Sequence, residues 1–79
     1  MPEQLSPAPR LLRRQQLEER VALSCSAIYA RLDRNSPYFD PAFPRPIKLG
    51  NGKRPPVAWV ESEVDAYIAA RIEASRQAA

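Results

Sequence analysis

The sequence predicts a mainly α-helical domain of three helices with one small β-hairpin, in a chain of 79 residues. Two short helical patterns joined by a tight turn occupy residues 15–34, and a glycine-containing turn separates two apolar segments within residues 47–60. A capped helical pattern follows. A chain of this length forms one small core, so its free energy of unfolding should be on the order of 3–5 kcal/mol. We expect a disordered arm at 1–10, an ordered domain at 11–75 and a tail at 76–79.

The first helix is expected at Gln15–Val21. Leu17 and Val21 are four residues apart and therefore share its inner face. The pair Leu11-Leu12 should form a short extended segment before this helix. A tight turn at Ala22-Leu23 ends it, and a second short helix after such a turn is the helix-turn-helix arrangement.

The second helix is predicted to follow Ser24, whose hydroxyl can accept a hydrogen bond from the free amides of the first turn. Ile28 and Leu32 share its inner face. The helix should end near residues 34–35, because Pro37 disfavours the helical conformation just before it. An ordinary amphipathic helix with a solvated outer face is the alternative for this segment. The outer face carries mostly short side chains, which would let it approach a groove closely: Cys25, Ser26, Tyr29, Ala30 and Asp33.

Residues 35–46 contain four prolines, which lower the entropy cost of holding this segment in one shape. We therefore expect a structured loop rather than a flexible linker. Its three aromatic residues, Tyr38, Phe39 and Phe43, are expected to be buried because each carries a large apolar surface.

A β-hairpin is expected after the loop. Its strands are Ile47–Leu49 and Val57–Val60, and the segment Gly50-Asn51-Gly52 between them is a turn signal. The tip carries Lys53 and Arg54, which suit contact with phosphates or the minor groove of DNA. Such residues are also ordinary in a solvated turn, so the tip alone does not decide between the two interpretations.

The third helix is expected at residues 63–75, because Ser62 and Asp65 have the spacing of a capping box. Its apolar residues fall on one face, and we expect that face to pack against Trp59 and the first two helices. These inward-facing residues are Val64, Tyr67, Ile68 and Ile72.

Positive charge is concentrated in the first two-thirds of the chain. Residues 10–54 hold ten basic and four acidic side chains, so they carry a net charge of +6, whereas the whole chain carries +3. Ten of the twelve basic residues are arginine, which makes forked contacts to phosphates and guanine. The asymmetry favours a face that binds a polyanion. A generic basic surface, as in small proteins from high-GC genomes, is the alternative.

The sequence lacks the residues on which several classes of function depend. The sequence has no histidine and one cysteine, which excludes an intramolecular disulfide and disfavours structural zinc. Glu61, Glu63 and Asp65 lie at a helix start, where the helix dipole and capping explain them without a metal. We therefore expect no enzyme, no cofactor and no small-molecule substrate. No apolar run approaches about 18 residues and no signal peptide is recognisable, so we expect a cytoplasmic, nucleoid-associated protein.

These elements in this order resemble the AlpA family of prophage-type regulators, within the MerR-like and excisionase-like winged-helix group. The resemblance covers about Leu11 to Arg71. The segment LLRRQQLEERVALS is similar to the family's first helix and turn, LSCSAIYARL to its recognition helix, FPRPIKLG to the lead into the wing, and WVESEVDAYIAARI to its terminal helix. The resemblance implies a winged helix-turn-helix fold whose second helix enters the major groove of DNA.

The resemblance also implies roles for individual residues. For Arg31, an ion pair with Glu18 or Glu19 is the alternative role. Three departures from the family pattern bear on the site. Ala22 stands where the turn often has glycine, and Cys25 stands where a basic residue is common. Residues 35–42 make the loop between the second helix and the wing longer than in the shortest members, for which Arg45 and Lys48 could compensate electrostatically. The implied base contacts are Cys25, Ser26, Tyr29 and Ala30; the implied backbone contacts are Arg13, Ser24, Arg31, Arg34 and Lys48; the implied wing contacts are Lys53 and Arg54.

The sequence therefore predicts a sequence-specific DNA-binding protein that regulates transcription in a prophage or other mobile element, with double-stranded DNA as its partner. One alternative is a recombination directionality factor (excisionase) that bends attachment-site DNA. Another is a protein-interaction adaptor without DNA binding, in which Tyr38 and Phe39 anchor an integrase or RNA polymerase. A DNA-packaging role is a third alternative. Self-association on DNA is a further expectation.

Overall fold

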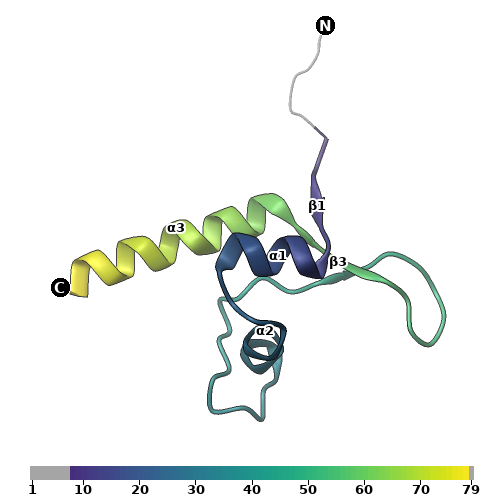
Figure 1. The fold of residues 1–79 in the computed structure, drawn as a ribbon, viewed down its shortest axis with the longest axis horizontal. Helices are drawn as coiled ribbons and strands as arrows, with labels where there is room; N and C mark the ends of the chain where they lie inside the picture. Colours follow the sequence, from purple (N-terminus) through teal and green to yellow (C-terminus); the bar gives the residue numbers. More distant parts are fainter. Residues whose placement is uncertain (1–7, 79) are drawn as a thin grey trace, which may run out of the picture.

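The computed structural model describes residues 8–78 of the chain (Figure 1). These residues form three helices and a small antiparallel sheet, which confirms the predicted mainly α-helical fold. The expected arm at 1–10 lies largely outside the described residues, and residues 8–10 have no regular secondary structure. In chain order the elements are β1 (Leu11–Leu12), α1 (Arg14–Val21), α2 (Cys25–Leu32), β2 (Ile47–Lys48), β3 (Val57–Val60) and α3 (Glu61–Ala78).

Strand β3 is the central strand of a three-stranded sheet with the order β1-β3-β2. Both neighbours run antiparallel to it: Leu12 pairs with Trp59, and Ile47 pairs with Ala58. The hairpin of β2 and β3 agrees with the prediction, although β2 ends at Lys48, one residue early. The pairing of β1 does not follow from the sequence, because two extended residues give no alternation that indicates a partner. With both of its edges paired, β3 places Ala58 and Trp59 in the buried centre of the domain.

Helix α1 begins at Arg14, one residue before the predicted start. The backbone N–H of Arg13 donates to Oε1 of Gln16 over 2.9 Å, which is the side-chain half of a capping box. The helix ends at Val21, and its C-cap is Ala22, whose φ of 58° and ψ of 40° are left-handed and whose N–H donates to the carbonyl of Glu18. This conformation is strained for alanine and free of strain for glycine. The turn that the family pattern gives to glycine is therefore made here by a less suitable residue.

Helix α2 begins as predicted. The backbone N–H of Ala27 donates to Oγ of Ser24 over 3.2 Å, so Ser24 is the N-cap. The helix ends at Leu32, a little before the predicted end near 34–35. There Asp33 takes an extended conformation, and its Oδ1 accepts a hydrogen bond from the backbone N–H of Asn35 over 2.9 Å. This Asx turn offers the chain an alternative to another helical turn.

The proline-containing loop between α2 and β2 buries one of its three aromatic residues. Phe43 is buried and its ring meets Tyr67 edge to face, with 4.9 Å between the centroids. Phe39 is half-buried, and the guanidinium of Arg45 lies over its ring at 5.9 Å. Tyr38 is 69% exposed, so the prediction that it is buried is wrong. The large apolar surface of an aromatic ring predicts burial, but the loop leaves Tyr38 on its outer side.

The core lies where α1, α2 and α3 meet the sheet. Trp59 is its largest fully buried side chain, and its Nε1–H donates to the carbonyl of Pro44 over 3.1 Å. A buried indole N–H needs such a partner, so this bond also ties the loop to the sheet. The buried core residues in this cluster are Leu12, Leu17, Ile28, Phe43, Trp59 and Val64.

Helix α3 begins directly after β3, two residues before the predicted start. The backbone N–H of Glu61 donates to the carbonyl of Arg10 over 2.8 Å. The segment that precedes β1 thus satisfies an amide of the first turn, and the predicted cap at Ser62 is wrong because Ser62 lies inside the helix.

The second half of α3 projects beyond the body of the domain (Figure 1). The helix ends at Ala78, so residues 76–78 are helical although the sequence predicts a tail there. Val64 is buried as predicted, whereas Ile72 is 44% exposed and is not part of the core. The apolar stripe of α3 therefore extends beyond the part of the domain that could cover it.

Candidate nucleic-acid interface

The outer face of α2 is the centre of the candidate interface. Ser26 and Tyr29 are exposed, Tyr29 to 45%, and Ala30 is half-exposed. Cys25 lies at the edge of this face and is half-buried. The structure therefore brings the four predicted base-contacting residues onto one short helix, which Ile28 fixes to the core. Mostly short side chains cover the helix, so another surface can approach its backbone closely.

A hollow of about 430 Å³ lies beside this face. Side chains of α2 and its N-cap line one side, and the ring of Tyr38 from the following loop lines the other. The sequence predicts Tyr38 in the core or against a protein partner, so its place beside α2 does not follow from the sequence. We call this space the α2 hollow; its lining residues are Ser24, Ser26, Ala27, Ala30, Arg31 and Tyr38.

Two of the predicted backbone-contacting residues are also used in the fold. Oγ of Ser24 accepts the hydrogen bond from Ala27, which leaves the hydroxyl proton available to donate to a phosphate. Arg31 is half-buried, and its Nη1 donates to the carbonyl of Ala27 over 3.1 Å. An arginine has five N–H donors, so Arg31 keeps donors for a ligand while one is held by its own helix.

The alternative ion pair of Arg31 with Glu18 or Glu19 is not formed among the described residues. Glu18 instead pairs with Arg14, at 2.6 Å between Oε2 and Nη1. The side chain of Cys25 and then the Glu18 carboxylate raise the pKa of Arg14. The side chain of Arg14 thus lies close to Cys25 at the start of α2, with its charge paired to Glu18.

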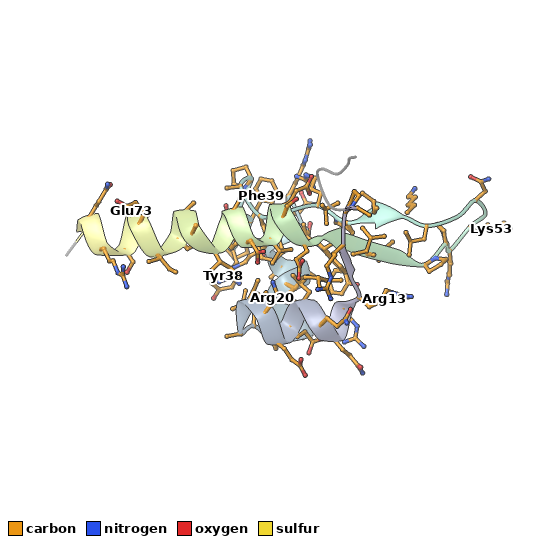
Figure 2. The ribbon with its side chains drawn as sticks, turned by 90° about the horizontal axis from the view of Figure 1, so that it is seen from above. Arg13, Arg20, Tyr38, Phe39, Lys53 and Glu73 are labelled. Atoms are coloured by element: carbon orange, nitrogen blue, oxygen red, sulfur yellow. The ribbon has the colours of Figure 1, made fainter. Side chains whose placement is uncertain are left out.

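Five predicted phosphate-contacting side chains are exposed on the surface, and among residues 8–78 none of them forms an ion pair. Figure 2 shows two of them at separate places, one at the start of α1 and one at the far end of the β2–β3 hairpin. That hairpin is the wing, and its Gly52 has a φ of 111°, which glycine adopts without strain. The five side chains are Arg13, Arg34, Lys48, Lys53 and Arg54.

Arg20 has a structural role that the sequence does not indicate. Its Nη1 donates to Asp65 and its Nη2 to Glu61, each over 2.8 Å, so it joins α1 to α3. The Nε of Arg10 lies 3.8 Å from Glu61. The hydrogen bond from Arg20 lowers the pKa of Glu61. Glu61 and Asp65, two of the three acidic residues at the start of α3, are therefore ion-paired with Arg20.

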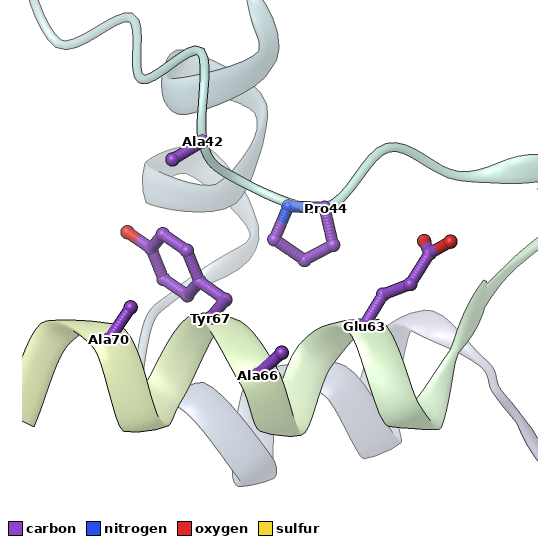
Figure 3. A pocket seen from close by; sticks show the side chains of 6 residues that line it. All are labelled: Ala42, Pro44, Glu63, Ala66, Tyr67 and Ala70. Atoms are coloured by element: carbon purple, nitrogen blue, oxygen red, sulfur yellow. The ribbon is translucent and has the colours of Figure 1, made fainter.

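A second network holds the loop against α3. The hydroxyl of Tyr67 donates to Oδ2 of Asp40 over 2.8 Å, and burial and then this carboxylate raise the pKa of Tyr67. Beside this contact a groove of about 380 Å³ opens between the loop and α3 (Figure 3). It is lined by Ala42, Pro44, Glu63, Ala66, Tyr67 and Ala70, which differ from the residues of the α2 hollow.

The part of the chain that the structure describes contains no group of three or more His, Cys, Asp or Glu residues placed to hold a metal ion. No helix in that part combines the length and the apolar character needed to cross a membrane.

Two helices joined by a tight turn, a basic hairpin and a third helix that completes the core define a winged helix-turn-helix protein. The family model of the prophage CP4-57 regulatory protein (AlpA) matches residues 10–72. The chain therefore belongs to the AlpA family of prophage regulatory proteins, and the resemblance seen in the sequence is confirmed. No curated protein and no solved structure shows a significant match.

Proposed function

We propose that this chain is a sequence-specific DNA-binding protein that regulates transcription in a prophage or related mobile element. In this proposal α2 lies in the major groove with Ser26, Tyr29 and Ala30 toward the base edges. Lys53 and Arg54 at the wing tip hold the backbone or the minor groove. The observation that carries the proposal is the outer face of α2, which bears mostly short side chains on a helix that Ile28 fixes to the core. Family membership supports the regulatory role.

The chemistry of α2 assigns different tasks to its parts. Short side chains can make few hydrogen bonds to base edges, so most of the affinity should come from contacts between cations and phosphates. Specificity then depends on Tyr29, on close packing against the bases, and on DNA shape or several copies bound together. This division makes the wing and the helix separable by experiment.

The wing is tested by the double substitution Lys53→Ala/Arg54→Ala. Each phosphate contact contributes about 0.9 to the slope of log K against log salt, so the slope should fall by about 1.8 units. Affinity should fall alike for all sequences, because phosphate contacts carry no sequence information. The matched control is Arg71→Ala/Arg76→Ala, which removes the same charge from exposed positions on α3. An unchanged slope in the wing variant would remove the wing from the interface.

The helix is tested by Tyr29→Ala, with binding measured to a selected site and to random duplex. If Tyr29 contacts bases, the ratio of the two affinities shrinks; if its hydroxyl contacts a phosphate, both affinities fall equally. If the unmodified protein shows no salt-dependent retention on either heparin or DNA, the adaptor function is favoured instead. DNA bending by the bound protein would favour the excisionase function.

A further inference from the structure

Tyr38 is an exposed aromatic residue whose backbone is fixed. Its own N–H donates to Oγ of Ser36 over 3.1 Å, and the N–H of Phe39 donates to the carbonyl of Ser36 over 3.1 Å. The N–H of Asp40 donates to the carbonyl of Arg31 over 2.9 Å and joins the loop to the end of α2. Figure 2 shows Tyr38 and Phe39 on different sides of the α3 ribbon. The loop therefore fixes the backbone at Tyr38, so little backbone entropy is lost there when a ligand binds.

The α2 hollow has an apolar centre and a polar edge. Ala27 and Ala30 line the space from the helix, and Tyr38 lines it from the loop. Ser24, Ser26 and Arg31 also line it, and no acidic side chain does. This composition suits a small apolar group carried by a polyanion.

Duplex DNA presents one apolar group on the floor of its major groove, the C5-methyl of thymine. Alanine methyls and aromatic rings are the side-chain groups that contact it. The hollow has no asparagine or glutamine that could pair with adenine. A guanine would be read through Arg31, which already gives one donor to the helix. The exposed Arg34 lies just beyond the end of α2.

We propose that the α2 hollow receives the C5-methyl of a thymine in the major groove, and that Tyr38 is the specificity-determining residue that closes the hollow over it. This inference depends on the proposed DNA-binding function and adds the base class that one part of the interface prefers. An apolar side chain of a protein partner is the competing occupant.

The experiment begins with a site selected from a random duplex library by the full chain. Each thymine of that site is then replaced in turn by uracil, which removes the methyl group and nothing else. At least one position should lose about fourfold in affinity, the value of one buried methyl. In Tyr38→Ala the thymine-to-uracil ratio at that position should fall to about one, whereas Tyr38→Phe should keep it. Circular dichroism checks that each variant is folded.

The outcomes separate the two proposals. If the chain selects no duplex at all, the proposed function fails and the inference fails with it. If a site is selected but no thymine-to-uracil replacement changes affinity, only the inference is overturned, and this result needs no variant to fold. If Tyr38→Ala weakens both duplexes equally, Tyr38 contacts the backbone and does not close a methyl pocket. Binding of a phage protein that Tyr38→Ala abolishes, with an unchanged thymine-to-uracil ratio, would assign the hollow to a protein partner.

Discussion

Replacing Ala22 by glycine should stabilise the protein. Among the described residues, Ala22 is the one non-glycine residue with a positive φ, and it lies exposed in the turn between α1 and α2. Its left-handed conformation brings Cβ too close to the following carbonyl oxygen. Because the side chain is exposed, its removal sacrifices little buried surface. The turn geometry itself, and hence the relation of α1 to α2, should not change.

The magnitude follows from two opposing terms. The left-handed conformation costs alanine roughly 1–2 kcal/mol relative to glycine. Glycine increases the entropy of the unfolded chain, which offsets about 0.4–1 kcal/mol of that gain. The expected net stabilisation by Ala22→Gly is about 0.5–1 kcal/mol. In a domain of this size the midpoint of thermal unfolding should rise by about 2–8 °C.

Urea unfolding followed by circular dichroism measures the effect. The matched control is Ala69→Gly, the same chemical change at an exposed position inside α3, which should destabilise by about 1 kcal/mol. Opposite signs for the two substitutions would show that the backbone conformation decides the result. DNA affinity of Ala22→Gly should be unchanged. A loss of stability in Ala22→Gly comparable to that in Ala69→Gly would refute the assignment of strain to this turn.

Three further predictions concern the cap and the two networks. Ser24→Ala should cost about 1 kcal/mol in thermal unfolding; Ser24→Asp should keep the cap but weaken DNA binding, because a carboxylate repels phosphate. Since Arg20 lowers the pKa of Glu61 below 4.5, their interaction is fully present above that pH and is lost as the pH falls through the lowered pKa. The stability difference between the natural protein and Arg20→Gln should therefore shrink in urea titrations run from pH 6 to pH 3, and a constant difference would contradict this. Tyr67→Phe should destabilise by about 1–2 kcal/mol in urea unfolding, because it removes the hydrogen bond to the Asp40 carboxylate.

The local features of the helices could be predicted from the sequence. The four-residue spacing of Leu17 and Val21 placed α1 within one residue of its observed bounds, and the cap at Ser24 placed the start of α2. The end of α2 was predicted two to three residues too late. Periodicity and capping are properties of neighbouring residues, so they are visible without the fold. The apolar stripe of α3 misled at Ile72, because a pattern shows which face is apolar but not where the covering body ends.

Contacts between distant segments could not be predicted. The partner of β1 is β3, which follows the loop and the wing, and the amide of Glu61 is satisfied by Arg10 from before β1. The candidate site shows the same limit. Its helix and wing residues were predictable from their motifs, whereas the pairing of Arg20 with α3 and the place of Tyr38 beside α2 depend on how the loop folds back.

The pairing of β1 with β3 has a consequence for synthesis of the chain on the ribosome. Leu11 aligns with Val60, so the sheet is completed only after the loop and the wing have been translated. Until then the apolar faces of the first two helices have no Trp59 or Val64 to cover them. Helices this short are marginal in water by themselves. A nascent or truncated chain that stops before β3 should therefore not present a formed α2, so the proposed DNA binding would begin only after β3 and the start of α3 have been made.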